Sequence, residues 1–317
     1  MAGPGAIGAF VAARLTLAGW PVAVLARGDT ARALRAGPLR LRDGDQDRSV
    51  QLDVVDDVAD AAPVQLALVC VKSHDTAGVA AVLSRALADD AVVLSLQNGV
   101  GNPAVLGRAL PAGVELGAAA VYLGCQRLAL DHVVRRPSID RATGRLRDRL
   151  VGGGPARAAA ALEAVGEACG VPVELVERPE TALWTKLVAN ASLNTVTALG
   201  RARVGRVFAD PRAVELMLAL GAEVEAVAAA AGVPLPAGAA RAYVADARRR
   251  LPADGGSSTL FDLEAGRRLE RDALVGAVVR EGRRLGVAVP VSEACDALLS
   301  LLDPGPGLRS RADASPA

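Results

Sequence analysis

Hydrophobic and polar positions in the first 180 residues alternate between two kinds of segment. Short runs of β-branched residues are separated by longer stretches in which apolar residues recur at helical spacing. These patterns indicate strands and helices, and their alternation indicates parallel βαβ units. We expect strands at residues 21–26, 65–71, 91–96, 114–123 and 171–176. We expect helices from the glycine-rich segment 3–8 to about residue 18, and at residues 76–88, 103–110 and 155–169.

Two segments of this half have weaker patterns. Residues 39–54 are expected to form a hairpin or meander inserted in the sheet. Residues 123–154 are irregular and rich in arginine, and we expect an antiparallel hairpin there with a loop around residues 135–149.

The strand pattern stops after residue 178, and only helical spacing follows. The helices expected there are residues 180–199, 211–231, 237–251, 268–285 and 292–302. The fold class is therefore α/β: a doubly wound sheet in residues 1–177, followed by an all-helical domain in residues 178–302. Residues 303–317 are rich in proline and serine, and we expect a disordered tail.

Composition narrows the range of partners. The 317 residues include 36 basic and 35 acidic side chains, for a net charge of +1, and only 2% are aromatic. A nucleic-acid binder would need a basic face and often stacking rings, so that class is excluded. No apolar run is long enough to span a membrane, and no signal peptide is recognisable. The four cysteines are widely spaced in apolar runs, so we expect core thiols, no metal site and a reducing cytoplasm.

Lysine and asparagine are rare in this chain. Lysine stands only at positions 72 and 186, and every other basic residue is arginine. Asparagine stands only at positions 98, 102, 190 and 194. An ammonium can lose its proton when its pKa falls, whereas a guanidinium cannot, so the lysines either mark sites where arginine cannot substitute or are simple leftovers.

The segment Gly3-Pro4-Gly5-Ala6-Ile7-Gly8 fits the G-x-G-x-x-G pattern of dinucleotide-binding sheets of the Rossmann type. Its glycines permit a tight turn, close approach of a pyrophosphate and close packing of helix on strand, while the helix N-terminus attracts the phosphate. Alone the pattern is weak, but here a helix and then a strand follow it.

Arg27 ends the next expected strand, about twenty residues after the glycines. An acidic residue there would bind the ribose hydroxyls of NAD, whereas arginine suits the 2′-phosphate of NADP. The alternative is a solvated charge at a strand end.

Two later strands also end in polar residues, in the segments Val71-Lys72-Ser73-His74 and Gln97-Asn98-Gly99. Open α/β sheets bind ligands at the carboxyl ends of their strands, so Lys72 and Asn98 are candidates. Asn98-Gly99 can equally be a plain turn. We expect His74 to be a polar residue that starts a helix, because no carboxylate partner is obvious in the sequence.

The strongest local pattern is Trp184-Thr185-Lys186-Leu187-Val188-Ala189-Asn190-Ala191-Ser192-Leu193-Asn194. Lys186, Asn190 and Asn194 are four residues apart, which stacks them on one face of a continuous helix. A solvated face is the alternative, although exposed surface elsewhere uses arginine and glutamate. The segment from Ser257 and Ser258 to Glu270 adds hydroxyls and carboxylates, or only a helix cap.

Taken together, the motifs GPGAIG, VKSHDT, LQNGVG, WTKLVANASLN and SSTLFDLEAGRRLERDALVGAVVREGRRLGVAVP resemble the ketopantoate reductases in sequence and order. The resemblance covers nearly the whole chain. It implies a Rossmann domain, a helical C-terminal domain and an active site in the cleft between them. It also implies NADPH-dependent reduction of a 2-oxo acid, with ketopantoate to (R)-pantoate in coenzyme A biosynthesis as the leading case, by a cytoplasmic monomer or homodimer.

The resemblance also implies residue roles. Lys186 matches the proton donor, and Asn190, Asn194 and Ser258 match substrate-binding positions. Asn98 matches the asparagine near nicotinamide and substrate. Glu270 matches a glutamate that contacts cofactor or substrate, and Arg27, Lys72 and the glycine segment match the cofactor site.

Three features depart from the family pattern. Only Met1 and Ala2 precede Gly3, so most of the first strand is missing. We expect unpaired neighbours, poor solubility and a natural start a few residues upstream. Residues 126–149 are longer and more basic than usual, and Val204 stands where some members carry a polar substrate contact.

Two rival functions follow from these departures. One is a related dehydrogenase for a different hydroxy or imino acid. The other is a non-catalytic NADP-binding paralogue, which the short N-terminus favours.

Overall fold

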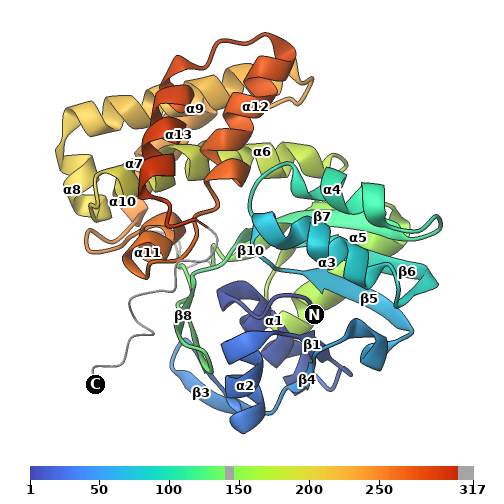
Figure 1. Cartoon of the computed structure of the whole chain (residues 1–317). Helices are drawn as coiled ribbons and strands as arrows, with labels where there is room; N and C mark the ends of the chain where they lie inside the picture. Colours follow the sequence, from blue (N-terminus) through green and yellow to red (C-terminus); the bar gives the residue numbers. More distant parts are fainter. Residues whose placement is uncertain (140–145, 306–317) are drawn as a thin grey trace. The chain divides into compact units, whose positions relative to one another are not determined.

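The computed structural model describes residues 1–139 and 146–305, and the chain divides into two compact units. Unit 1 is residues 1–182, and unit 2 begins at Leu183. The boundary expected from sequence, after residue 177, lies before the helix that runs across this division. Each unit is described by itself below (Figure 1).

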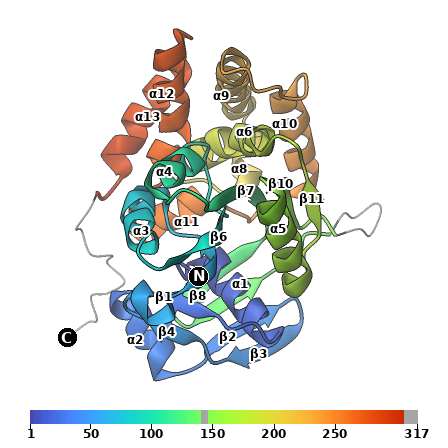
Figure 2. The same cartoon turned by 90° about the vertical axis from the view of Figure 1, so that its right-hand side faces the viewer.

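Unit 1 is built around a mainly parallel sheet (Figures 1 and 2). Its strands are β1 (Ala23–Leu25), β4 (Asp53–Val55), β5 (Val64–Val69), β6 (Leu87–Ser95), β7 (Glu115–Tyr122), β10 (Arg149–Gly153) and β11 (Val173–Leu175). Hydrogen bonding gives the orders β1-β4 and β11-β10-β7-β6-β5. Only the β7-β10 pair is antiparallel among these strands.

Ala2 joins the two parts of this sheet. It bridges in parallel to Leu25 of β1 and to Val69 of β5. The amide of Leu25 donates to the carbonyl of Met1, and the amide of Cys70 donates to the carbonyl of Ala2, both at 2.8 Å. The first-strand position of a Rossmann sheet is therefore held by two residues. From the sequence we expected the neighbouring strands to be unpaired. Instead β1 and β5 pair with Met1 and Ala2 at their carboxyl ends.

Helices cover both faces of the sheet. They are α1 (Ala6–Leu17), α2 (Gly28–Ala36), α3 (Thr76–Leu83), α4 (Asn102–Ala109) and α5 (Ala156–Cys169), with 3-10 turns at Val58–Ala61 and Ser73–Asp75. Alternation along β5 explains the two layers, because neighbouring side chains of a strand point to opposite faces. Ala67 and Val69 belong to the core that holds side chains of α3 and α4. Leu68 belongs to the core that holds side chains of α1 and α5.

A second sheet corrects the expectation for residues 39–54. Strands β2 (Leu39–Asp43) and β3 (Gln46–Val50) form the expected hairpin, but it is not inserted in the main sheet. Instead β2 pairs in parallel with β9 (His132–Arg135), which forms the expected Arg-rich hairpin with β8 (Cys125–Ala129). Leu39 and Leu41 are buried while Arg40 is exposed, so this sheet has one apolar face, as alternating polarity requires. Residues 140–145 of the expected loop lie outside the described residues.

Unit 2 is helical throughout its described part. The elements are α6 (Pro179–Ala189, which starts in unit 1), a π-helical segment (Asn190–Asn194), α7 (Thr195–Leu199), α8 (Val204–Ala209), α9 (Pro211–Ala230), α10 (Ala239–Arg250), α11 (Ser258–Glu264), a 3-10 turn (Arg271–Ala273), α12 (Val275–Leu285) and α13 (Pro290–Leu302). The longest helix, α9, is central, and Met217, Leu220 and Val224 on it are fully buried. Asp210 caps it by accepting from the amide of Arg212, and Pro211 opens its first turn.

Asp303 is the first residue of the tail that we expected to be disordered, but hydrogen bonds hold its side chain. Its carboxylate accepts hydrogen bonds from the amides of Leu269 at 3.1 Å and Gly305 at 3.2 Å. Asp303 is thus held against unit 2. Residues 306–317 of the expected tail lie outside the described residues.

Candidate functional site

The glycine segment connects Ala2 to α1 in a tight turn. Gly3 has φ +92°, and a Cβ there would lie 2.6 Å from the amide nitrogen of Val71. A Cβ on Gly8 would collide with the carbonyl oxygen of Gly3. Glycine is therefore required at both positions, as close packing of helix on strand demands.

Gly5 differs from Gly3 and Gly8 because a side chain at this position would meet no clash. It is the N-cap of α1 without a side-chain cap, and a Cβ added there would meet nothing within 4 Å. The first amides of a helix have no partner within the helix, and the helix dipole favours an anion beside them. Open space beside Gly5 and an uncapped first turn fit the pyrophosphate of a dinucleotide.

Arg27, Lys72 and Asn98 lie at the same edge of the sheet as the glycine segment. Each comes two to three residues after the carboxyl end of β1, β5 or β6, and these strands run parallel to one another and to Ala2. Arg27 is exposed and is the N-cap residue of α2, while Lys72 and Asn98 are partly buried. The sequence-predicted cofactor residues of unit 1 are thus gathered along one edge.

Buried polar side chains behind this edge escaped the sequence analysis. Thr76, Gln97 and Asn102 are at most 5% exposed and are joined by hydrogen bonds. The scarcity of asparagine was the available signal, since Asn102 is one of only four in the chain.

His74 has a carboxylate partner in its neighbour Asp75, which was not obvious from the sequence. Its Nε2 lies 3.5 Å from the carboxylate of Asp75, and both residues belong to the 3-10 turn that precedes α3. Nδ1 of His74 is buried without a hydrogen-bond partner in the described structure. His74 therefore starts a helical segment as predicted, but it is oriented by its neighbour.

Lys186 is a titratable group of unit 2 whose pKa is shifted by burial. It lies in the last turn of α6. The residue as a whole is only partly buried, but desolvation of its ammonium lowers the pKa to about 8. The carboxylate of Glu270, which is 8% exposed, acts in the opposite direction and raises that pKa. The structure therefore brings Lys186 and Glu270 into one electrostatic environment.

The helix that carries Lys186 runs without a break to Leu199 but is not α-helical throughout, which corrects the predicted stripe. Residues Asn190–Asn194 form a π-helical segment between α6 and α7. Its hydrogen bonds span five residues instead of four, so the asparagines do not repeat at the α-helical angle. Two hydroxyls bind carbonyls around it: Ser192 donates to that of Val188 at 2.6 Å and Thr197 to that of Leu193 at 2.8 Å. Single π turns of this kind are frequent at functional sites.

The serine segment adjoins this π segment. Nδ2 of Asn194 donates to the hydroxyl of Ser258 at 3.3 Å. Ser257 caps α11 by accepting from the amide of Leu260, and its hydroxyl lies 2.7 Å from that of Thr197. The helix cap suggested from the sequence is therefore made by Ser257, and Ser258 contacts Asn194.

Asn190 and Val204 complete the predicted set in unit 2. Asn190 opens the π segment and is partly buried. Val204 is 3% exposed and belongs to the hydrophobic core of the unit. Where some family members carry a polar substrate contact, this chain therefore has a core residue that packs against its apolar neighbours.

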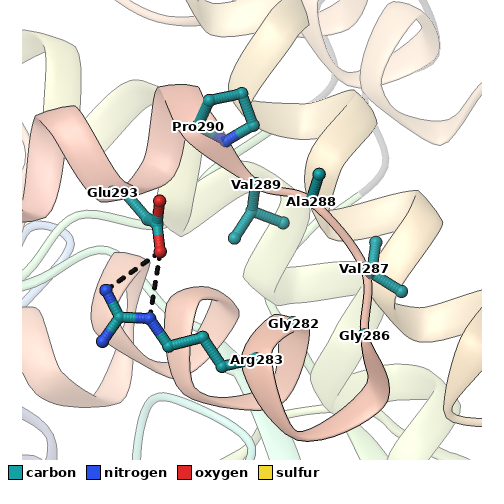
Figure 3. Close-up of a pocket in the computed structure, with 8 residues that line it drawn as sticks. All are labelled: Gly282, Arg283, Gly286, Val287, Ala288, Val289, Pro290 and Glu293. Atoms are coloured by element: carbon teal, nitrogen blue, oxygen red, sulfur yellow. Dashed lines mark hydrogen bonds and ion pairs between the residues drawn. The ribbon is translucent and has the colours of Figure 1, made fainter.

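A surface pocket of the described residues lies apart from the residues discussed above. It lies at the turn between α12 and α13, where Arg283 and Glu293 form an ion pair at 2.9 Å (Figure 3). None of the sequence-predicted residues is among those that line it. Across residues 1–139 and 146–305 no cluster of histidine, cysteine or acidic side chains could hold a metal ion. No helix in that part of the chain has the length and apolar character of a membrane span.

Comparison with known proteins agrees with both units. The family model described as ketopantoate reductase PanE/ApbA matches residues 1–142, and the model of the C-terminal part of the same family matches residues 179–303. A solved structure described as a PanE/ApbA family ketopantoate reductase from Ralstonia eutropha JMP134 is similar with a TM-score of 0.84 and 35% identity. The similarity covers 95% of this chain and 98% of that one.

Curated relatives extend this agreement over most of the chain. The 2-dehydropantoate 2-reductase of Archaeoglobus fulgidus is 33% identical over 290 residues, which is 92% of either chain. The enzyme of the same name from Halobacterium salinarum is 34% identical over 294 residues, which is 91% of this chain and 93% of the relative. With a Rossmann-type unit, a helical unit and these relatives, the chain belongs to the ketopantoate reductase family.

Proposed function

We propose that this protein reduces a 2-oxo acid to a 2-hydroxy acid with NADPH, and that 2-dehydropantoate is its substrate. Reduction of a ketone needs a hydride donor and a group that protonates the new alkoxide. The observation that carries the proposal is Lys186, whose pKa of about 8 suits proton donation near neutral pH. The names of the relatives supply the substrate class.

The roles of the residues follow from their chemistry. A bound reduced nicotinamide supplies hydride to the carbonyl carbon. Lys186 gives a proton to the carbonyl oxygen, and its ammonium stabilises the negative charge that develops there. Asn190, Asn194 and Ser258 orient the hydroxyl and carboxylate of the substrate. Glu270 holds the ammonium form of Lys186 by opposing its desolvation.

The preference for NADPH over NADH is part of the same proposal. The glycine segment and the first turn of α1 take the pyrophosphate, and Asn98 takes a position beside the nicotinamide. Arg27 and Lys72 supply two cationic side chains at the sheet edge, and a guanidinium suits a 2′-phosphate. We further expect a cytoplasmic monomer or homodimer.

A steady-state assay of NADPH oxidation tests the function directly. The full chain is mixed with 2-dehydropantoate and with a panel of other 2-oxo acids, and absorbance of the reduced nicotinamide is followed. We expect 2-dehydropantoate to give the highest kcat/KM. Higher kcat/KM with another oxo acid selects the related dehydrogenase, which the apolar Val204 favours. Tight NADPH binding without turnover of any oxo acid selects the non-catalytic paralogue.

A further inference from the structure

A buried hydrogen-bond network ties together the two loops that carry Lys72 and Asn98. Nδ2 of Asn102 donates to the backbone carbonyl of Asn98 at 2.7 Å and to the hydroxyl of Ser73 at 3.2 Å. The hydroxyl of Thr76 donates to Oδ1 of Asn102 at 3.0 Å. Nε2 of Gln97 donates to that hydroxyl at 2.7 Å, and also to the carbonyl of Val71 at 3.0 Å.

The direction of every bond in this network is determined. The carbonyl of Asn98 can only accept, so the amide nitrogen of Asn102 must face it. Oδ1 of Asn102 then needs a donor, which must be the hydroxyl of Thr76. Because the hydroxyl of Thr76 donates to Asn102, it must accept the hydrogen bond from Gln97. The amide nitrogen of Gln97 also donates to the carbonyl of Val71.

The ends of the network agree with the same proton arrangement. The hydroxyl of Ser95 donates to Oε1 of Gln97 at 3.2 Å. The hydroxyl of Ser73 donates to the carbonyl of Asn98 at 3.2 Å while it accepts from Asn102. Thr76, Gln97 and Asn102 in the middle of the network are buried. A change of their hydrogen bonds would leave a buried polar group without its partner, so the network favours one rigid arrangement.

We propose that Asn102, Thr76 and Gln97 are positioning residues that set the backbone of Asn98 against the loop of Lys72 and thereby align the nicotinamide for hydride transfer. Asn98 receives two hydrogen bonds on its carbonyl, and the loop after β5 is held at Val71, Ser73 and Thr76. Burial of the three positioning residues keeps them from contacting a ligand directly. The inference rests on the proposed function, since it assigns those loops to the cofactor.

The test uses a matched pair of substitutions at Thr76. Thr76→Val keeps the shape of the side chain but removes both hydrogen bonds, whereas Thr76→Ser keeps the hydroxyl. We expect Thr76→Val to lower kcat about 10-fold to 100-fold, the scale for a displaced reacting group, and Thr76→Ser to remain near wild type. The primary isotope effect on kcat with 4-deuterated NADPH should rise in Thr76→Val, because misaligned hydride transfer becomes slower relative to the other steps.

The isotope effect separates positioning from simple destabilisation. A variant that is only less folded loses kcat without a change in isotope effect, and that result would overturn the inference, as would wild-type values in folded Thr76→Val. If Thr76→Val does not fold, Ser95→Ala, which removes only the terminal hydroxyl, is measured in the same way with a smaller rise expected.

The proposed function and this inference can fail separately. If wild type turns over no oxo acid, the reductase proposal fails, and the dissociation constant for NADPH, measured by its fluorescence, decides the inference. A rise of about tenfold in Thr76→Val but not in Thr76→Ser supports it. Equal dissociation constants, or no NADPH binding by wild type, overturn it.

Discussion

At the scale of the residue, Lys186 differs from an arginine in a way that bears on the proposed proton transfer. Its pKa is lowered to about 8 by desolvation, so the ammonium is acidic enough to release a proton near neutral pH. A guanidinium stays protonated under any such conditions and has a planar shape. The two side chains are therefore not interchangeable at this position.

Substitution of Lys186 should show this difference directly. We expect Lys186→Arg to lose nearly as much kcat as Lys186→Ala, by about 10² to 10⁴, the range for a missing general acid. His74→Ala serves as the control, because His74 lies in unit 1 beside Asp75 and has no proposed catalytic role. The proposed mechanism would be wrong if steady-state kinetics showed that His74→Ala abolishes turnover while Lys186→Ala retains it.

The lowered pKa also predicts a pH profile. Reduction needs the ammonium form of Lys186, which is present below its folded-state pKa of about 8. The rate of reduction should therefore be level below about pH 8 and fall about tenfold per unit above it. Oxidation of the hydroxy acid needs the neutral amine and should rise through the same pH. A profile without a transition between about pH 7 and 9 in either direction would contradict the assignment.

Cofactor choice gives a second test at a single residue. Arg27 is exposed at the end of β1, so its substitution by alanine should leave the fold intact. We expect Arg27→Ala to raise the KM for NADPH much more than the KM for NADH, because a charge-assisted bond to the 2′-phosphate is lost. Arg32→Ala, which removes an exposed arginine from the same helix, is the matched control. Equal effects of Arg27→Ala on both cofactors would place it away from the phosphate.

Single residues became candidates from the sequence where their position or their rarity set them apart. Lys72 and Asn98 were selected because they follow predicted strands. Asn190 and Asn194 were selected for their spacing from Lys186, and the scarcity of lysine and asparagine supported these choices. Asn102 has the same rarity, but it opens α4, where a helix-start residue is unremarkable. Its hydrogen bonds reach residues 26 and 29 positions away, and no local pattern reports contacts at that distance.

At the scale of the element, periodicity predicted regular helices well and the π segment not at all. The spacing of Lys186, Asn190 and Asn194 fits an uninterrupted helix. The hydroxyls of Ser192 and Thr197 bind carbonyls in and beside the π segment, and each is buried. Hydrogen bonds of this kind from Ser and Thr hydroxyls to helix carbonyls often bend a helix. The Ser and Thr residues clustered here were therefore the sequence feature that pointed to an irregular helix, which the spacing of Lys186 and the asparagines did not reveal.

Thr197 provides the test of this element. Thr197→Val removes hydrogen bonds to the carbonyls of Leu193 and Asn194 and to the hydroxyl of Ser257, all in the buried interior. We expect the free energy of unfolding to fall by about 1 to 3 kcal/mol, and kcat/KM for the oxo acid to fall because Asn194 and Ser258 lose support. Thr197→Ser should retain both. Denaturation and kinetics equal to wild type in Thr197→Val would mean that the hydroxyl does not hold the segment.

The second sheet shows a different limit of sequence prediction. Both hairpins were predicted from local patterns, but their mutual pairing was not. The register joins Arg40 to His132 and Asp43 to Arg135, which are about ninety residues apart. Arg135 also binds the carboxylates of Asp43 and Asp148 at 3.0 Å. These contacts depend on tertiary packing, which the alternation of a single strand does not encode.

At the scale of the whole molecule, the proposed site residues are divided between two units with separate cores. Unit 1 holds the glycine segment, Arg27, Lys72 and Asn98, and unit 2 holds Lys186, the π segment, Ser258 and Glu270. The strand pattern of the sequence stops after residue 178, and the two units divide between residues 182 and 183. In the proposed function, the segments of unit 1 bind the cofactor and those of unit 2 bind the oxo acid.

This division predicts how each ligand protects the backbone. NADPH at about 100 times its dissociation constant should stabilise the native protein by about 2.7 kcal/mol, and hydrogen exchange should slow at residues 3–8, 27–31 and 71–102. Addition of an oxo acid should then slow exchange at residues 186–197 and 257–262, because the substrate is assigned to the asparagines and Ser258. Peptide-level mass spectrometry of the full chain measures both, with D-glucose in place of the oxo acid as control. Protection by NADPH that omits residues 3–8 would contradict the cofactor assignment. An oxo acid that slows exchange only in unit 1 would contradict the substrate assignment.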